Sequence, residues 1–349
     1  MAIDMDEPLD PAALAADLVA VESTSGAEGE VVALLDDLLA LRGWQVQRIP
    51  VTPGRDDLLV TTGQAPDVTF STHLDTVPPF IPPRFVGGRL YGRGSCDAKG
   101  IAAAMCCAAE RLRARGVAVA LLFVVGEETM HDGATAANLV PTTSRVLING
   151  EPTESTLALG TKGAMRFTLR TAGRAAHSAY PALGHSATRD LVHLLAEIDG
   201  LTLPHDRVLG ETTINIGSLA GGVADNVVAP WAEARLMARL VSPAAELRTV
   251  LERWVNGRAA IEFDVLVPPV LLGTIPGIET SVVAYATDIP KLTNWGTPYL
   301  FGPGSIHVAH TDDEYVELDA LRQAVGIYER LALDGLAAAR ATTPAATPR

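Results

Sequence analysis

Three apolar segments of this chain, each of strand length, end in side chains that can bind metals or move protons. They span residues 68–72, 119–125 and 146–148, and they are followed by His73, by Glu127-Glu128 and by Glu151. In open α/β sheets, ligands bind beyond the carboxyl ends of the strands. Because the ends of neighbouring parallel strands share one edge of a sheet, we expect these side chains to form a single site.

A helix is predicted over residues 98–115, between two of these strands, because the segment is rich in alanine. A strand, a helix and a second strand make a βαβ unit, which implies parallel pairing. Asp97 stands at the start of the helix, where free N–H groups and the helix dipole stabilise a carboxylate. Asp97 is therefore either an ordinary helix cap or a further member of the site. The fold class that follows is α/β, with a mostly parallel mixed sheet flanked by helices.

The sequence pattern changes after Glu154. Strand-like segments at 164–171, 212–219 and 232–240 are interleaved with helix-like segments at 190–199 and 243–256. This order is typical of a small two-layer α+β domain, and 349 residues are too many for one ordinary core. We therefore predict an inserted domain at 157–270 within a catalytic domain formed by 1–156 and 271–339. Residues 340–349, which are mainly Ala, Thr and Pro, are expected to form a disordered tail.

The charge balance and the cysteine count limit the partners. The formal net charge is −14, and the basic residues form no run, which argues against nucleic acid and against anionic lipid surfaces. No segment approaches the ~20 apolar residues of a membrane span, and the acidic start lacks the features of a signal peptide. Three cysteines offer no disulfide framework, so a reducing cytoplasm is expected. Cys96, beside Asp97, is interpreted as a buried thiol, with a soft metal ligand as the alternative.

The residue types at the expected site suit a pair of divalent metal ions. A carboxylate that bridges two metals, with imidazole and further carboxylates around it, binds zinc, cobalt or manganese. Such metals polarise a carbonyl and lower the pKa of water, while a separate carboxylate must carry the proton. Glu127 and Glu128 can divide these tasks, because adjacent side chains point in different directions. Asp75, two residues after His73, can orient the imidazole.

A last ligand is expected from the C-terminal part of the chain, where the residues alone do not choose between His307 and His310. Each candidate residue also has an ordinary explanation when it is taken alone. His73 could be a core or turn histidine, Glu127-Glu128 a solvated loop, and Glu151 a turn residue before a proline. Their joint position at strand ends is what favours one metal site.

Five motifs, in order along the chain, are similar to those of a known family. They are His-Leu-Asp-Thr-Val-Pro (73–78), Tyr-Gly-Arg-Gly-Ser-Cys-Asp-Ala-Lys-Gly (91–100), Gly-Glu-Glu (126–128), Gly-Glu-Pro-Thr (150–153) and Ala-His-Thr-Asp-Asp-Glu (309–314). They resemble the dinuclear-zinc metallopeptidases, the family of acetylornithine deacetylase, succinyl-diaminopimelate desuccinylase, glutamate carboxypeptidase and aminoacylase. The resemblance covers nearly the whole chain and is nearest to the acetylornithine deacetylase and acyl-lysine deacylase members.

This resemblance implies a role for each motif residue. Two divalent metal ions are expected, Zn²⁺ first, with Co²⁺ or Mn²⁺ as alternatives. The implied ligands are His73 and Glu151 for one ion and Glu128 and His310 for the other, with Asp97 bridging both. Glu127 becomes the general base and acid, and Asp75 supports His73. His310 is preferred to His307 because it stands just ahead of the Asp-Asp-Glu segment, as in the family motif.

The inserted domain is implied to act as a lid and as the surface of a homodimer. Residues 173–178 resemble the lid motif whose histidine, here His177, stabilises the tetrahedral oxyanion, often from the partner subunit. Such a donor accelerates the reaction because the negative charge develops only in the transition state. His185 is the alternative to His177.

Substrate contacts are implied at four positions. Residues 221–228 resemble the segment whose asparagine, here Asn226, meets the substrate. Arg239 is matched to the arginine that pairs with the α-carboxylate of the substrate, with Arg235 as the alternative, because arginine suits a planar bidentate partner. Gly304 and Ser305 are expected to line the substrate end of the site.

The chain departs from the family pattern in places. Ala98 replaces the Met, Asp or Asn that commonly follows the bridging aspartate, although Asp-Ala-Lys-Gly occurs in deacylases of ornithine and lysine biosynthesis. Pro230 lies one place later than usual after Asn226, which shifts the spacing that supports Arg239. The chain is also shorter than many members of the family.

The function that the resemblance implies is metal-dependent hydrolysis of the amide bond of an N-acyl amino acid, with N-acetylornithine as the expected substrate. Succinyl-diaminopimelate, an acylated lysine, and small dipeptides or C-terminal peptide bonds are alternatives for the same site. A non-enzymatic alternative is an inactive, metal-stabilised binding protein. It is disfavoured because Glu127 and Asp97, the expected general base and bridging carboxylate, are both present.

Overall fold

The computed structural model describes residues 7–342, and it divides into two compact units. Of the described residues, unit 1 holds 7–159, 272–281 and 287–342, and unit 2 holds 160–271 and 282–286. The insertion predicted at 157–270 begins three residues before the long segment of unit 2 (160 − 157) and ends one residue before its end (271 − 270). The short return of the chain through 282–286 was not predicted.

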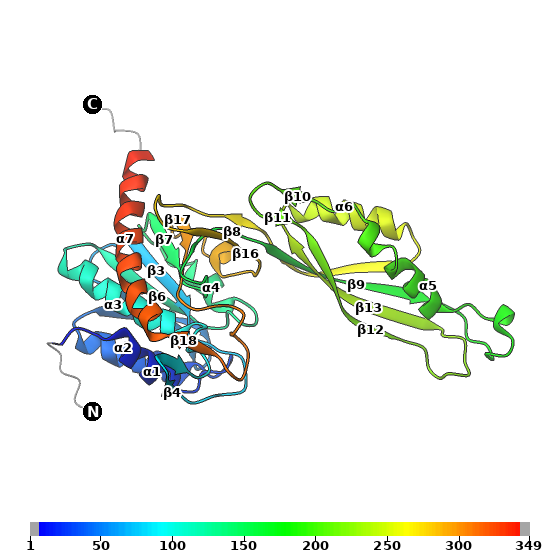
Figure 1. Ribbon diagram of the computed structural model, residues 1–349, viewed down its shortest axis with the longest axis horizontal. Helices are drawn as coiled ribbons and strands as arrows, with labels where there is room; N and C mark the ends of the chain where they lie inside the picture. The colour runs from blue at the N-terminus through cyan, green and yellow to red at the C-terminus, as the bar shows by residue number, and fades with distance from the viewer. Residues whose placement is uncertain (1–6, 343–349) are drawn as a thin grey trace. The chain divides into compact units, whose positions relative to one another are not determined.

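Unit 1 is built on a six-stranded mixed sheet with the order β1-β2-β6-β3-β7-β17 (Figure 1). The strands are β1 (Gln45–Thr52), β2 (Arg55–Thr61), β3 (Val68–His73), β6 (Val119–Val124), β7 (Val146–Asn149) and β17 (Thr297–Leu300). The last four in spatial order, from β6 to β17, are parallel, while the β1–β2 hairpin joins β6 in antiparallel fashion at one edge. This arrangement confirms the predicted mostly parallel mixed sheet.

Helices cover both faces of this sheet, which explains why its central strands lack polar alternation. All six residues of β6 are buried, and successive residues of the strands enter two different apolar clusters. The larger cluster includes side chains of α1 (Pro11–Val19), α2 (Gly29–Leu41), α3 (Lys99–Ala114) and α7 (Leu318–Thr342). The smaller cluster, on the other face, includes α4 (Asp132–Ala137) and the segment that follows the short 3₁₀-helix η3 (Ile289–Lys291).

The C-terminal helix α7 is longer than predicted. It runs to Thr342, so residues 340–342 are helical and the tail predicted to begin at 340 is wrong there. The reason is local, since alanine dominates residues 337–341 and has the highest helix propensity. The rest of that prediction, 343–349, lies outside the described residues. Among residues 7–342, no helix combines the length and the apolar character needed to cross a lipid bilayer.

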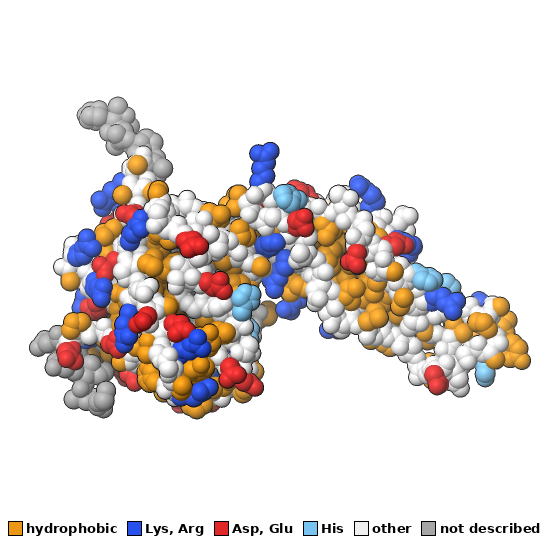
Figure 2. Space-filling model, viewed as in Figure 1, with side chains coloured by type: hydrophobic (Ala, Val, Ile, Leu, Met, Phe, Trp, Pro, Cys, Tyr) orange, Lys and Arg blue, Asp and Glu red, His pale blue; other side chains and the backbone are white. Residues whose placement is uncertain are grey.

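Unit 2 is a two-layer α+β unit, as predicted. Its antiparallel sheet has the order β12-β13-β9-β14, formed by β9 (Gly163–Ala172), β12 (Thr213–Gly221), β13 (Trp231–Leu240) and β14 (Ala260–Val267). Alternate residues of β13 are buried under α5 (Ala187–Leu195) and α6 (Ala244–Val255). Hydrophobic side chains also remain on the surface of this unit (Figure 2), including Ile216 and Leu219 of the edge strand β12.

The remaining elements are short. They are β4 (Arg84–Val86), β5 (Arg89–Tyr91) and β18 (Tyr315–Glu317) in one sheet, β8 (Leu157–Thr161), β15 (Val270–Leu271) and β16 (Thr280–Val283) in another, the β10 (His205–Asp206) and β11 (Gly210–Glu211) pair, and the 3₁₀-helices η1 (Pro181–Leu183) and η2 (Ile198–Gly200).

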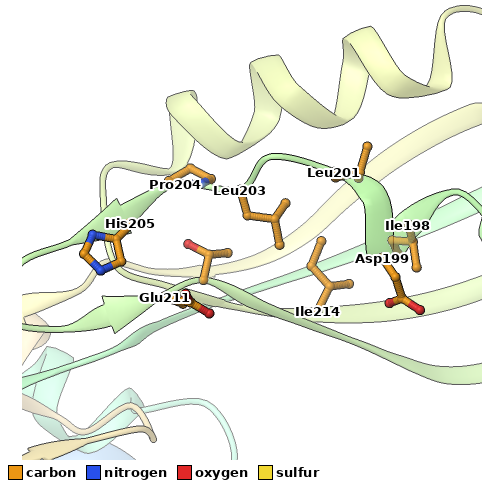
Figure 3. A pocket seen from close by; sticks show the side chains of 9 residues that line it. Ile198, Asp199, Leu201, Leu203, Pro204, His205, Glu211 and Ile214 are labelled. Atoms are coloured by element: carbon orange, nitrogen blue, oxygen red, sulfur yellow. The ribbon is translucent and has the colours of Figure 1, made fainter.

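A pocket in unit 2 lies between η2 and the β10–β11 pair, where Leu203 and Ile214 face each other (Figure 3). None of its lining residues belongs to the predicted site.

A buried carboxyl group on β2 gives the stability of unit 1 a pH dependence. Asp57 is fully buried and accepts a hydrogen bond from the Val125 N–H at 3.0 Å. Burial raises the pKa of Asp57 from 3.8 to about 8, and the Asp288 and Asp132 carboxylates act in the same direction. An acid whose pKa is raised by folding binds more protons when folded. The folded state therefore loses stability as the pH rises from about 4 to about 8, by about 1.4 kcal/mol per pH unit from this group.

We expect Asp57→Asn to flatten this dependence, because asparagine keeps the acceptor for Val125 and has no proton to lose. Urea unfolding at several pH values between about 5 and 8 measures the effect. The free energy of unfolding of the variant should rise relative to that of the wild type as the pH increases. Asp56→Asn removes a partly exposed carboxylate from the same strand and is the matched control. Parallel curves for Asp57→Asn and the wild type would contradict the assignment.

Candidate metal centre

The ends of three adjacent strands and two loops carry the predicted ligands. His73 is the last residue of β3, Glu128 follows β6 and Glu151 follows β7, and these three strands are neighbours in the order β6-β3-β7. Asp97 lies in the loop before α3, and His310 lies in the loop between β17 and β18. The sheet order therefore brings together side chains that are up to 237 residues apart in sequence (310 − 73).

The five side chains form two groups of possible ligands that share Asp97. In each group, one nitrogen or oxygen atom per residue lies within 4.8 Å of the others. One group is His73, Asp97 and Glu151, in which the His73 Nε2 atom is 3.0 Å from Asp97 Oδ1 and 3.9 Å from Glu151 Oε2. The other is Asp97, Glu128 and His310, in which His310 Nε2 is 2.8 Å from Glu128 Oε1 and 3.4 Å from Asp97 Oδ2. Each oxygen of Asp97 therefore faces a different histidine.

These residues fit two divalent cations. Three carboxylates are held together here, and Asp97 and Glu151 are at most 5% exposed. Burial raises the pKa of Glu151, the Asp97 carboxylate adds to the rise, and the Glu151 Oε1 atom has no hydrogen-bond partner among the described residues. Grouped buried carboxylates are unfavourable unless positive charge neutralises them. One imidazole and two carboxylates per ion, with one carboxylate shared, form a donor set that suits zinc or a similar metal.

The pKa of His310, the histidine of the second group, is shifted by the two carboxylates of that group. Hydrogen bonds to Asp97 and then Glu128 raise the pKa of His310 to about 10. A cation bound between these residues would replace that proton. Metal binding at this site should therefore release protons and weaken as the pH falls.

Asp75 contacts both His73 and the backbone of the Glu127-Glu128 turn. The His73 Nδ1–H group donates mainly to the backbone carbonyl of Asp75, at 2.9 Å, and the Asp75 carboxylate is 3.5 Å away. That carboxylate also accepts the backbone N–H groups of Glu127 and Glu128 at 3.0 and 3.1 Å, and the Ser25 hydroxyl at 2.7 Å. Asp75 therefore positions the turn that presents Glu127 and Glu128, and its carbonyl selects the His73 tautomer whose Nε2 faces the metal groups.

Glu127 belongs to neither group of ligands. Its side chain is 11% exposed, and its backbone N–H is held by Asp75. Burial raises the pKa of Glu127, and the Glu151 carboxylate acts in the same direction. A carboxylate that lies beside the metal ligands, belongs to neither group and has a raised pKa can accept and return a proton.

Glu314 and Arg93 are functional residues for which the sequence provided no role. The Glu314 Oε1 atom accepts the backbone N–H groups of Gly94, Cys96 and Asp97 at 2.9, 3.1 and 3.1 Å, while Arg93 donates to Oε2 at 2.6 Å. Both side chains are at most 2% exposed. Glu314 therefore holds the loop that presents Asp97. Both residues stand inside motifs singled out above, but only the tertiary structure pairs them.

The loop before α3 also decides two open alternatives. The N-cap of α3 is Ala98, which makes no side-chain cap, so the interpretation of Asp97 as an ordinary helix cap is wrong. Cys96 is a buried free thiol whose Sγ donates to the Ser305 carbonyl at 3.5 Å, and it belongs to neither metal group. Gly304 packs against this thiol with φ +88°, and a Cβ atom there would meet Cys96 Sγ at 2.5 Å.

Of the other predicted residues in unit 1, Ser305 donates its hydroxyl to Glu154 at 2.7 Å. His307 is exposed and belongs to neither metal group, whereas His310 belongs to one of them. The choice that the residues alone left open is thus made by the loop conformation, in which His310 adopts a positive φ of 63°.

Three predicted substrate residues lie in unit 2. His177 is exposed, and its segment pairs with the segment of Asn226 through a bridge to Val227 and the Ser178 N–H to Asn226 carbonyl bond of 2.9 Å. The side chain of Arg239 on β13 forms no hydrogen bond or ion pair with any described residue. Burial, and to a smaller degree Arg166, lowers its pKa. Arg235, the alternative to Arg239, pairs with Glu233 at 3.1 Å. His185, the alternative to His177, pairs with Asp190 at 2.6 Å.

Known proteins resemble this chain in sequence and in fold. The family model of peptidase family M20/M25/M40 matches residues 69–334. A peptidase M20 domain-containing protein of Schizosaccharomyces pombe is 38% identical over 332 residues, which cover 91% of this chain and 83% of the relative. A probable carboxypeptidase of Aspergillus clavatus is 36% identical over 372 residues, with coverage of 93% and 82%. The crystal structure of aminopeptidase PepT from Bacillus cereus has a TM-score of 0.78 at 20% identity, and the match covers 96% of this chain and 100% of that one.

The names of the two relatives are those of a peptidase and a carboxypeptidase, so the expected nearness to acetylornithine deacetylase is not confirmed. The family itself is shown by the match over most of the chain and by the identity to the first relative. This chain belongs to peptidase family M20/M25/M40.

Proposed function

We propose that the protein is a metal-dependent hydrolase of amide bonds next to a free carboxylate, with carboxypeptidase activity as the first candidate. The observation that carries this proposal is the pair of ligand groups sharing Asp97, with Glu127 beside them and bound to neither. Two divalent cations, Zn²⁺ first, would be held by His73, Glu151, Glu128 and His310 together with Asp97. When bound, they would polarise the scissile carbonyl and lower the pKa of a water molecule.

The protein's own residues account for the proton transfers. Glu127 takes a proton from water as the water oxygen bonds to the carbonyl carbon. The C–N bond then breaks, and Glu127 returns the proton to the departing nitrogen, so that amide and water become carboxylic acid and amine. His177 is proposed to donate a hydrogen bond to the oxyanion that forms between these steps. Asp75 keeps Glu127 and Glu128 in place through their backbone N–H groups.

Arg239 is the residue that favours a substrate with a free carboxylate. Its side chain is half-buried and has no acidic partner among residues 7–342. An unpaired, partly desolvated guanidinium gains most from a planar carboxylate. A peptide C-terminus and an N-acyl amino acid present the same group. N-acetylornithine therefore remains the second candidate, on the strength of Asp97-Ala98-Lys99-Gly100.

A substrate panel assayed with added zinc or cobalt tests the proposal. It contains short peptides, the same peptides with amidated C-termini, and N-acyl amino acids including N-acetylornithine. We expect hydrolysis of substrates with a free carboxylate and loss of most activity on the amidated ones. Arg239→Met should raise KM on the free acids, while Arg235→Met, the matched control, should not. Equal cleavage of free and amidated peptides would contradict the proposal.

We also propose a homodimer formed through unit 2. The edge strand β12 carries exposed apolar side chains, with Leu219 at 55% and Ile216 at 41% exposure, and an uncovered sheet edge invites pairing with a second copy (Figure 2). Light scattering should give twice the mass of the chain, and Leu219→Lys should shift the protein toward the monomer. A wild-type protein that is monomeric at assay concentration would remove this proposal.

A further inference from the structure

A third group of titratable side chains adjoins the proposed general base. Glu127, His131 and Asp288 each offer one polar atom within 4.8 Å of the others. His131 Nδ1 is 2.8 Å from Asp288 Oδ1 and 3.7 Å from Glu127 Oε1. Glu127 follows β6, His131 precedes α4 and Asp288 precedes η3, so three separate segments of unit 1 meet here. Neither His131 nor Asp288 has a part in the chemistry described so far.

The backbone holds His131 in an uncommon conformation. Its φ is +52°, in the left-handed region that is uncommon for residues other than glycine, although Asn, Asp and His enter it more often than the rest. The segment is secured on both sides, because the His131 N–H donates to the Gly126 carbonyl at 2.9 Å and its carbonyl accepts Thr135 N–H and Oγ1 at 3.1 and 2.8 Å. A conformation that is unfavourable by itself and is maintained by its surroundings often marks a functional position. Here it directs the imidazole toward two carboxylates.

Asp288 determines which way that imidazole faces. Its side chain is 2% exposed, and His131 is the one basic group within 4.0 Å of it in the described part of the chain. A buried carboxylate without such a partner would be costly. The short Nδ1 to Oδ1 distance therefore fixes the ring, with the same Nδ1 atom facing Glu127.

Glu127 needs such a neighbour. Its carboxylate belongs to neither group of metal ligands, so no bond to a metal would fix its rotamer. Among residues 7–342, His131 is the one basic side chain that lies within 4.0 Å of the Glu127 carboxylate. Nδ1 carries one hydrogen, which Asp288 accepts at 2.8 Å. At 3.7 Å, Glu127 Oε1 is therefore in electrostatic contact with this polarised N–H group and is not hydrogen-bonded to it.

We propose that His131, held by Asp288, is a positioning residue that keeps the Glu127 carboxylate turned toward the reacting water. The inference rests on the proposed function, because it assigns Glu127 the proton transfer. It adds a residue that binds neither metal nor substrate and that acts only through Glu127.

The test compares three variants of the metal-loaded enzyme. His131→Gly removes the imidazole and also relieves the positive φ. His131→Asn tolerates that φ and keeps an N–H donor near the place of Nδ1. Thr135→Ala removes the hydroxyl bond to the His131 carbonyl and leaves the three side chains untouched, so it is the matched control for loosening of the segment. Metal content and thermal unfolding are measured for each variant.

We expect His131→Gly to lower kcat by about 10–100-fold with KM nearly unchanged, because misplacement of a reacting group by about 1 Å has effects of this size. His131→Asn should recover most of the loss, and Thr135→Ala should stay within about twofold of the wild type. In a Glu127→Gln background, His131→Gly should cause no further loss, because residues that act as one unit are non-additive. All variants should retain two metal equivalents.

Three results would overturn the inference. Equal losses in His131→Asn and His131→Gly would show that the donor is irrelevant, and a loss confined to KM would place His131 at substrate binding. A third metal equivalent in the wild type that is missing from His131→Gly would assign the three side chains to a cation. These results differ from failure of the proposed function, which would appear as normal turnover in Glu127→Gln alone.

Discussion

Glu127→Gln is expected to lower kcat by roughly three orders of magnitude while leaving both metals bound. The reason is that glutamine is nearly isosteric but cannot accept or return a proton, and general acid–base catalysis contributes about 10²–10⁴-fold. Because Glu127 belongs to neither ligand group, metal affinity should not change. Steady-state kinetics on the preferred substrate and elemental analysis of the same sample measure both effects.

A matched control is available on the surface of unit 2. Glu252→Gln on α6 makes the same chemical change at an exposed position and should leave kcat and metal content unaltered. Turnover near the wild-type level in Glu127→Gln would show that another group carries the proton. Loss of metal along with activity would instead make Glu127 a ligand, and the division of tasks between Glu127 and Glu128 would be wrong.

Glu314→Ala is expected to destabilise unit 1 by about 3–5 kcal/mol, because it leaves the buried guanidinium of Arg93 without its counter-charge. It also removes the acceptor for three backbone N–H groups of the loop that presents Asp97. Metal binding should therefore weaken together with stability. Urea unfolding of the metal-free protein and zinc titration separate the two effects.

Two further variants sharpen this test. Glu317, three residues after Glu314, pairs with Arg89 at the surface, where the side chains of Arg89 and Glu317 are 39% and 47% exposed. Glu317→Ala should therefore lower the free energy of unfolding by less than about 1 kcal/mol. The double variant Arg93→Met/Glu314→Leu should regain part of the stability, since no buried charge is left unpaired. It should not regain metal affinity, because the loop remains without its acceptor. A Glu314→Ala protein as stable as Glu317→Ala would contradict the role of Glu314.

The long apolar strands and their polar ends were predictable because burial on both faces leaves a continuous apolar run. For β3, β6 and β7 the predicted segments agree with the structure to within two residues at each end, and the residues that follow them meet as expected. Strand β14 was missed because Glu262 and Asp264 obscure its alternation, and its neighbour β9 is what makes it a strand. Elements of two to four residues, such as β4, β5 and β18, are too short to have a pattern of their own.

The sequence by itself determined the α/β class of unit 1, the two-layer α+β class of unit 2, the mostly parallel sheet and the residues gathered at its edge, since periodicity and burial depend on neighbouring positions. Only the tertiary structure decided that His310 rather than His307 faces Glu128, that Asp75 holds the Glu127-Glu128 turn, and which partners Arg93 and His131 have. Those partners, Glu314 and Asp288, are 221 and 157 residues away. Contacts over such separations depend on how loops close in space, and no local pattern of residues records that closure.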